Sequence, residues 1–289
     1  MVIASIGRSG LTNILVDITR TNLDFPIEII LVLDGVDPHD ANLSIWEKIC
    51  SKVIITQERV GPSVAYSLGI NEVETDYFRI FTDDDVWDGF AFKRASRLVQ
   101  ENTVLVCKTR VQDEFGTRIR DSRFPRGISP IESVYMPIIP WKRNKVYFHL
   151  TSMIFPLAAS RIPLNESLII REDLDWLQQI HQAGIPFEFS DEIIGTVHPS
   201  HERSRKRQTL QIDLQWVNRL TIISKDLAKN FAFFHCFRSF AACGVPSEIL
   251  ARILPLIRVT GVPRLNQALV IMFYLTFSII RKIQIKLTR

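Results

Sequence analysis

The chain has 289 residues, of which 46% are hydrophobic and 23% charged, with a formal net charge of +4. This composition supports a sizeable buried core and excludes a mainly disordered protein. The four cysteines form no CxxC pair and no cluster with histidines at zinc-binding spacing, and no secretory signal is recognisable at the N-terminus, so we expect a cytoplasmic protein.

The first half of the chain alternates β-prone apolar runs with segments whose apolar residues recur at helical spacing. The expected strands are Val2–Ile6, Ile27–Leu33, Val53–Thr56, Tyr77–Thr82 and Val104–Val111. The expected helices between them are Leu11–Thr21, Ala41–Cys50, Pro62–Val73 and Phe90–Gln100. Near-continuous apolar strands separated by helices are typical of a parallel sheet that is covered on both faces. The sequence therefore predicts an α/β fold with a doubly wound, mostly parallel, Rossmann-like sheet.

The middle of the chain has weaker periodicity. Residues 121–145 are rich in proline and basic residues, and we expect them to form a loop that borders a pocket. The elements expected after this loop are a strand at Phe148–Phe155, a helix at Glu172–Ala183, and two short strands at Phe187–Phe189 and Ile193–Val197.

The last part of the chain is expected to be wholly helical. The expected helices are Leu210–Phe240, Ser247–Ile257 and Leu265–Leu287. From Arg252 onward the chain contains basic residues and no Asp or Glu. A basic helical region of this kind favours contact with the anionic inner leaflet of a membrane, and the alternative is packing on the globular body or in a dimer. We therefore divide the chain into a domain at 1–208 and a helical, membrane-associating extension at 209–289.

Three consecutive carboxylates follow the apolar run Tyr77–Thr82. Asp83, Asp84 and Asp85 precede Val86-Trp87, at the point where a buried strand would end. Open α/β sheets bind ligands at the carboxyl ends of their strands, and hard divalent cations prefer carboxylate oxygen. This pattern predicts a metal site, and the alternative is a solvated turn with helix-capping aspartates.

Other polar residues also lie where strands end or helices begin. They are Asp34 after the second strand, Arg59 before the third helix, the acid pair Glu172-Asp173 at the start of a later helix, and His198 and His201 after the last strand. Each has a simpler structural interpretation: an Asp-Gly turn, a loop-to-helix junction, acids that offset a helix dipole, and surface histidines.

Taken in chain order, these segments resemble the inverting glycosyltransferases of family two, which have the nucleotide-diphospho-sugar (GT-A) fold. The resemblance is carried by Ile29–Gly35, Arg59–Asn71, the Asp-rich Thr82–Trp87, Glu172-Asp173 and His198. The chain departs from the family pattern at Ala4–Arg8 and at Thr151-Ser152-Met153.

The resemblance implies a role for each matching residue. Asp34 would bind the nucleobase, Asp83 the ribose, and Asp85 the Mn²⁺ or Mg²⁺ that bridges the two phosphates. Asp173 would be the base that deprotonates the acceptor, with Glu172 as the second choice. The further donor contacts would be Ser5, Arg8, Arg59 and Asp84, and the further metal contacts would be Asp83 and His198, with His201 as the alternative to His198.

The implied function is metal-dependent transfer of a sugar from a nucleotide-diphosphate donor to a glycan or lipid-linked acceptor, in cell-surface polysaccharide synthesis. We expect the enzyme to be peripheral at the cytosolic face of the membrane and not to bind nucleic acid. The alternatives are a sugar-1-phosphate nucleotidyltransferase and a non-catalytic nucleotide-sugar-binding protein. An oxidoreductase is disfavoured because no GxGxxG motif follows the first strand.

Overall fold

The computed structural model describes residues 1–37, 39–40, 42–113, 116–125, 127–135, 146, 148–168, 170–198, 210–232 and 255. The chain forms two compact units. The first comprises Met1–Val134 and Lys145–Ser204, and the second comprises Tyr135–Asn144 and Arg205–Arg289. All described candidate site residues belong to the first unit.

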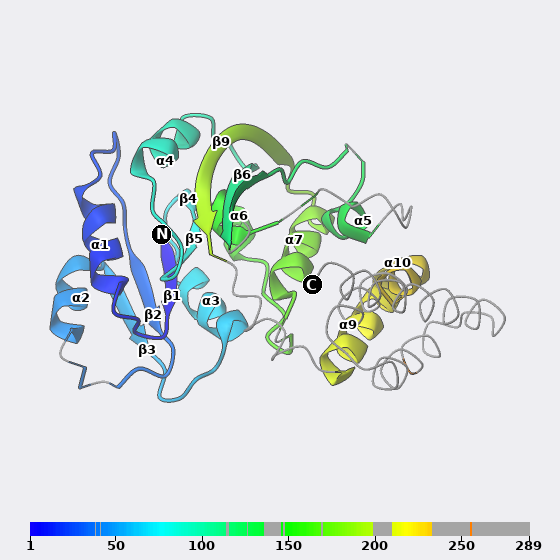
Figure 1. Ribbon diagram of the computed structural model, residues 1–289, viewed down its shortest axis with the longest axis horizontal. Helices are drawn as coiled ribbons and strands as arrows, with labels where there is room; N and C mark the ends of the chain where they lie inside the picture. Colours follow the sequence, from blue (N-terminus) through cyan, green and yellow to red (C-terminus); the bar gives the residue numbers. More distant parts are fainter. Residues whose placement is uncertain are drawn as a thin grey trace, which may run out of the picture. The chain divides into compact units, whose positions relative to one another are not determined.

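A four-stranded parallel sheet forms part of the first unit (Figure 1). Its strands, in spatial order, are β3 (Lys52–Ile55), β2 (Ile30–Leu33), β1 (Val2–Ser5) and β5 (Ile80–Thr82). Val2 of β1 is level with Ile30 on one side and with Ile80 on the other, and all three strand pairings are parallel. Because parallel strands end at the same edge, the residues that follow β1, β2 and β5 lie close together.

Helices cover both faces of this sheet, as expected for a doubly wound fold (Figure 1). They are α1 (Leu11–Arg20) and α2 (Leu43–Ile49) on one face and α3 (Pro62–Ile70) on the other. Successive strand residues point to opposite faces, so Ile3 packs with α1 and α2, whereas Val2 packs with α3. At Gly69, a Cβ would lie 2.4 Å from the Val2 side chain, so glycine allows α3 to approach the sheet closely.

A second, mixed sheet is built around β6 (Val104–Asp113). Its other strands are β4 (Tyr77–Phe78), β7 (Gly116–Arg120), β8 (Met153–Pro156) and β9 (Phe187–Val197). β9 is parallel to β6, whereas β7 and β8 are antiparallel to it, and β4 is antiparallel to β8. The helical elements that accompany this sheet are α4 (Gly89–Ser96), the 3-10 turn η1 (Leu150–Ser152), α6 (Leu157–Ser160) and α7 (Glu172–Gln182).

The α/β fold class and the parallel central sheet are confirmed, but several element predictions were wrong. The single strand expected at Tyr77–Thr82 is divided at Arg79, whose buried side chain lies between β4 and β5. The two short strands expected after Phe187 form one strand, because a register shift against β6 accommodates the polar residues between them.

The loop expected at 121–145 contains the short helix α5 (Pro130–Tyr135). Ser129 and Glu132 cap its start reciprocally: the Ser129 N–H donates to Glu132 at 2.8 Å, and the Glu132 N–H donates to the Ser129 hydroxyl at 3.3 Å. This S-x-x-E capping box, with proline at the next position, is a signal that the sequence contains. β7 was also not expected.

The second unit contains α9 (Leu210–Ile223) and α10 (Lys225–Asn230). The helix expected at Leu210–Phe240 is interrupted at Ser224, where the backbone is extended. The helices expected at Ser247–Ile257 and Leu265–Leu287 lie outside the described residues, save Pro255. Within the part of the chain that the structure describes, no helix combines the length and apolar character needed to cross a membrane.

Candidate active site

The acid turn, Asp83–Asp85, follows β5 at the edge where the parallel strands end. Asp83 is 5% exposed, and each of its carboxylate oxygens has a donor in the protein. The Ser5 hydroxyl donates to Oδ2, and the Arg8 guanidinium donates to Oδ1. Ser5 ends β1, which pairs directly with β5, so adjacent strands position this contact. The structure thus brings three predicted donor-binding residues together.

Arg8 spans two members of the acid turn. Its Nη2 lies 3.3 Å from Oδ2 of Asp84, in addition to its bond with Asp83. The preceding Gly7 has φ of 75°, and a Cβ there would lie 3.1 Å from Val36, so this turn requires glycine. The Gly7 N–H also donates to the Ser5 hydroxyl at 2.9 Å. The turn after β1 therefore directs Arg8 toward the acid turn.

Asp85 differs from its two neighbours because, among the described residues, no lysine or arginine forms an ion pair with it. It is 6% exposed, and its Oδ2 accepts from the Thr82 hydroxyl at 2.5 Å. Burial raises the pKa of this carboxyl, and the nearby His149 opposes that rise. A divalent cation would stabilise such a buried, unpaired carboxylate, so Asp85 fits the metal that the acid turn predicts.

Asp34 follows β2 at the same edge and is buried. Its Oδ1 accepts from the Val60 N–H at 2.7 Å, and its Oδ2 accepts from the Gly61 N–H at 3.1 Å. These bonds tie the loop before α3 to the end of β2. Arg59 is exposed in this loop, and its backbone passes so close to Gly35 that a Cβ at Gly35 would lie 2.8 Å from the Arg59 N.

The acid pair Glu172-Asp173 begins α7. Arg171 before it has φ of 69°, a left-handed conformation that turns the chain into the helix. Asp173 accepts from the Leu174 N–H at 2.7 Å, which orients its carboxylate. Burial raises the pKa of Asp173, while the Leu174 N–H, His149 and Arg171 lower it. A carboxyl with a raised pKa in a polar cluster is a candidate general base.

Tyr66, from α3, is the residue on which the acid turn and the acid pair converge. Burial raises the pKa of its hydroxyl well above the usual value, and four carboxylates raise it further: Glu172, Asp85, Asp84 and Asp173. Because such effects weaken with distance, carboxylates from two distant segments of the chain lie within electrostatic range of this one phenol. The hydroxyl of Tyr66 therefore remains protonated and neutral.

His149 is a residue that sequence reasoning missed. Its Nδ1 lies 2.7 Å from the Thr151 hydroxyl, and its charge lowers the pKa of both Asp85 and Asp173. His149 is thus the basic side chain that lies near both acid clusters. A signal was present, because this histidine lies two residues before Thr151, where the small-residue segment that departs from the family pattern begins.

Arg79 lies behind the acid turn and is also a residue that the sequence did not single out. It is 2% exposed, and its guanidinium donates to the carbonyls of Thr151 (2.8 Å from Nε) and Ile194 (2.7 Å from Nη2). The aromatic rings around it belong to Phe81, Trp87 and Phe92. Burial lowers its pKa to about 10. Arg79 thereby joins η1 to β9 next to the acid turn.

His198 follows β9 and is exposed. An isolated bridge pairs Val86 with Thr196, and the Val86 N–H donates to the Thr196 carbonyl at 3.0 Å. The end of β9 therefore runs beside the acid turn. Within the described residues, however, no three His, Cys, Asp or Glu side chains gather as a metal cluster. His201 lies outside those residues.

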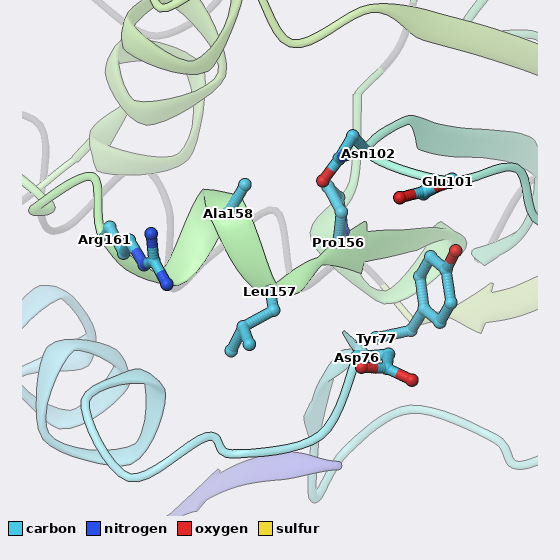
Figure 2. Close-up of a pocket in the computed structure, with 8 residues that line it drawn as sticks. All are labelled: Asp76, Tyr77, Glu101, Asn102, Pro156, Leu157, Ala158 and Arg161. Atoms are coloured by element: carbon cyan, nitrogen blue, oxygen red, sulfur yellow. The ribbon is translucent and has the colours of Figure 1, made fainter.

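Figure 2 shows the residues that line a hollow of about 520 Å³. Its lining includes Tyr77 at the start of β4, Glu101 and Asn102 just before β6, and Arg161. The candidate site instead follows the ends of β1, β2 and β5. None of the predicted site residues lines this hollow.

A family model described as Glycosyl transferase family 2 matches residues 11–162, more than half of the chain. The matched range includes the acid turn and ends before the acid pair. No curated protein sequence matches the chain significantly.

Among solved structures, the chain is similar to several of S. aureus TarS. The crystal structure of TarS 1–349 in complex with UDP is 16% identical, with a TM-score of 0.55 over 89% of this chain and 80% of that chain. The TarS 1–349 complex with UDP-GlcNAc is 15% identical, with a TM-score of 0.53 over 80% and 65%. A further TarS crystal structure is 17% identical, with a TM-score of 0.51 over 75% of this chain but only 39% of that chain.

Proposed function

The chain belongs to glycosyl transferase family 2, and on that basis we propose that it moves a sugar from a nucleotide-diphosphate donor to a hydroxyl of a glycan or lipid-linked acceptor. Its fold is of the GT-A type. TarS, whose structure it resembles, has been crystallised with UDP and with UDP-GlcNAc, which supports a nucleotide-sugar donor here.

The observation that carries the proposal is that carboxylates of both the acid turn and the acid pair act on the buried hydroxyl of Tyr66 and raise its pKa. An inverting transfer needs one group of charges at the departing diphosphate and a separate base at the attacking hydroxyl. Two acid clusters from different parts of the chain, close to each other but with different partners, meet that need. One follows β5 and faces Arg8, and the other begins α7.

Asp85 is the proposed main ligand of a divalent cation, Mn²⁺ or Mg²⁺, with Asp83 and His198 as further contacts. Its burial, its raised pKa and its lack of a Lys or Arg partner in the described part of the chain support this role. When bound, the cation would neutralise charge on the departing diphosphate. Asp34 would contact the base and Asp83 the ribose. The further donor contacts would be Ser5, Arg8, Arg59 and Asp84.

Asp173 is the proposed general base, with Glu172 as the second candidate. The raised pKa of Asp173 brings the carboxyl closer to the working pH, and the Leu174 N–H holds its orientation. Asp173 would take the proton from the acceptor hydroxyl while the oxygen of that hydroxyl bonds to the anomeric carbon of the sugar. The bond from that carbon to the diphosphate oxygen breaks at the same time, so the configuration inverts without a covalent enzyme intermediate.

The basic character of the C-terminal region supports a proposal for the acceptor and the cellular location. Residues 209–289 are proposed to hold the enzyme at the cytosolic face of the membrane, where their basic residues would meet anionic lipid headgroups. An acceptor linked to lipid, in cell-surface polysaccharide synthesis, would be available there.

Slow hydrolysis of a nucleotide sugar is the direct test of this function. The protein is incubated with a panel of nucleotide sugars and with Mn²⁺ or Mg²⁺, and release of the nucleoside diphosphate is measured. We expect hydrolysis of one donor class that stops when the cation is chelated and that is absent in Asp85→Asn. Binding of a donor without any turnover would favour a non-catalytic nucleotide-sugar-binding protein, and formation of a nucleotide sugar from a sugar 1-phosphate would favour a nucleotidyltransferase.

A further inference from the structure

The positive charge that offsets the acid turn in this structure comes from Arg8. Its guanidinium donates a hydrogen bond to Oδ1 of Asp83 and also forms an ion pair with Asp84. The Ser5 hydroxyl donates to Oδ2 of Asp83. Both oxygens of Asp83 are therefore engaged. A divalent cation that used Asp83 as a ligand would have to share it with, or take it from, the guanidinium.

Arg8 is the member of this group that is able to move. The Asp83 side chain is 1% exposed and Ser5 is 3% exposed, and both are attached to paired strands. The Arg8 side chain is 32% exposed and follows a glycine turn. A long, partly solvated side chain reorients at lower cost than a carboxylate buried at a strand end.

Cation and guanidinium compete for one carboxylate, and their like charges repel. A diphosphate changes this balance because it offers the guanidinium another anionic partner. The planar fork of arginine matches phosphate oxygens and forms two parallel hydrogen bonds with them. Binding of the diphosphate would then favour release of Arg8 from Asp83, and that release would in turn favour binding of the diphosphate.

We propose that Arg8 exchanges partners during donor binding: it pairs with Asp83 in the ligand-free protein and moves to the donor diphosphate when the divalent cation takes Asp83. This inference rests on the proposed function of the site. The exchange couples the two ligands, so each raises the affinity for the other. It also limits cation binding in the absence of donor.

Mn²⁺ binding, measured from the EPR signal of the free ion, tests the exchange without any activity assay. Titrations are made on wild type and Arg8→Gln, with and without UDP, and corrected by protein-free titrations with the same UDP. In wild type, Mn²⁺ alone binds weakly and UDP strengthens its binding. In Arg8→Gln, Mn²⁺ alone binds on the order of tenfold more tightly than in wild type, because a competing charge is gone. The enhancement by UDP becomes smaller, because Arg8 no longer links the two ligands.

Two further variants serve as controls for the change in Mn²⁺ affinity expected in Arg8→Gln. Arg97→Gln removes an arginine whose ion pair with Asp24 is on the surface, and it should bind Mn²⁺ as wild type does. Arg8→Lys keeps the charge but not the fork, so Mn²⁺ alone should bind as weakly as in wild type, with less enhancement by UDP. Circular dichroism and thermal melting confirm that each variant is folded.

An Mn²⁺ affinity in folded Arg8→Gln that equals or falls below that of wild type would overturn the exchange, while leaving the proposed function in place. If wild type binds no Mn²⁺ even with UDP, both the exchange and the cation role of Asp85 are wrong. Mn²⁺ binding that persists in Asp85→Asn would overturn the proposed ligand but not the exchange at Asp83. The three outcomes are therefore distinguishable.

Discussion

The Nδ1 atom of His149 lies 2.7 Å from the Oγ1 atom of Thr151. The Thr151 hydroxyl also lowers the pKa of Asp85, as does His149. The paired side chains of His149 and Thr151 thus both favour the ionised form of Asp85. The same imidazole lowers the pKa of Asp173, which connects the acid turn with the acid pair.

His149→Asn should change the pH dependence of turnover. The charge of His149 lowers the pKa of Asp173, so its loss raises that pKa further. A base must be ionised to act, so the acid limb of the kcat/KM profile should move to higher pH, and activity should fall more in mildly acidic than in mildly alkaline buffer. His181→Asn, near the end of α7 against Phe187, serves as the control and should keep the wild-type profile. An unshifted acid limb in His149→Asn would contradict the connection.

Asp85→Asn should abolish metal-dependent turnover and at the same time stabilise the protein without metal. Burial raises the pKa of Asp85, so the folded state binds a proton there more readily than the unfolded state does. Above this raised pKa, the ionised carboxylate lowers the free energy of unfolding, and a neutral amide removes that cost. We expect a Tm at neutral pH that is higher by a few degrees. Asp84→Asn, at an exposed carboxylate, should leave Tm nearly unchanged, and equal effects in the two variants would refute the argument.

Asp173→Asn should retain donor binding and lose turnover. The amide keeps the shape of the side chain but accepts no proton, and loss of a general base lowers kcat by about 10²- to 10⁴-fold. Glu172→Gln should reduce kcat much less. The measurements are donor affinity by calorimetry and single-turnover rate. If Glu172→Gln were the more damaging change, the base would be Glu172 instead.

Arg79→Met should destabilise the first unit, although Arg79 contacts no substrate in the proposed mechanism. The change leaves the buried carbonyls of Thr151 and Ile194 without their donor, at a cost of about 1–3 kcal/mol for each group. Thermal or urea unfolding measures this loss. The lysine in Arg79→Lys can still donate to one carbonyl, so the unfolding free energy of this variant should lie between those of Arg79→Met and wild type. A wild-type unfolding free energy in Arg79→Met would show that the rings around this guanidinium suffice to hold η1.

Removal of residues 263–289 should release the protein from membranes. The segment contains basic residues and no acidic ones. Each lysine or arginine near an anionic membrane surface contributes about 1 kcal/mol to the free energy of membrane binding. Flotation with vesicles that contain anionic lipid should recover the full chain but not the truncated one. Neutral vesicles are the control and should recover neither. Equal recovery of both chains with anionic vesicles would show that residues outside 263–289 bind the membrane.

Much of the parallel sheet was predictable because a strand that is buried on both faces has apolar residues at consecutive positions of the sequence. Runs such as Ile30–Leu33 are apolar at every position, which is what a strand covered on both faces requires. The mixed sheet was not predictable in the same way. β7 is polar and half exposed, so only its pairing with β6 makes it a strand. The two apolar runs of β9 were predicted as strands, but only pairing with β6 continues the strand through Ser190-Asp191-Glu192.

Local sequence patterns were enough to predict that carboxylates follow a buried strand at Asp83–Asp85 and that a second acid pair begins a helix at Glu172. The partner of each acid, in contrast, depends on how the strands and helices pack. Asp83 is paired with Arg8, Asp85 has no Lys or Arg partner among the described residues, and Tyr66 and His149 lie near both clusters. These relationships join residues that are distant in the chain, and only the packing of strands and helices brings them within the short range over which charges and hydrogen bonds act.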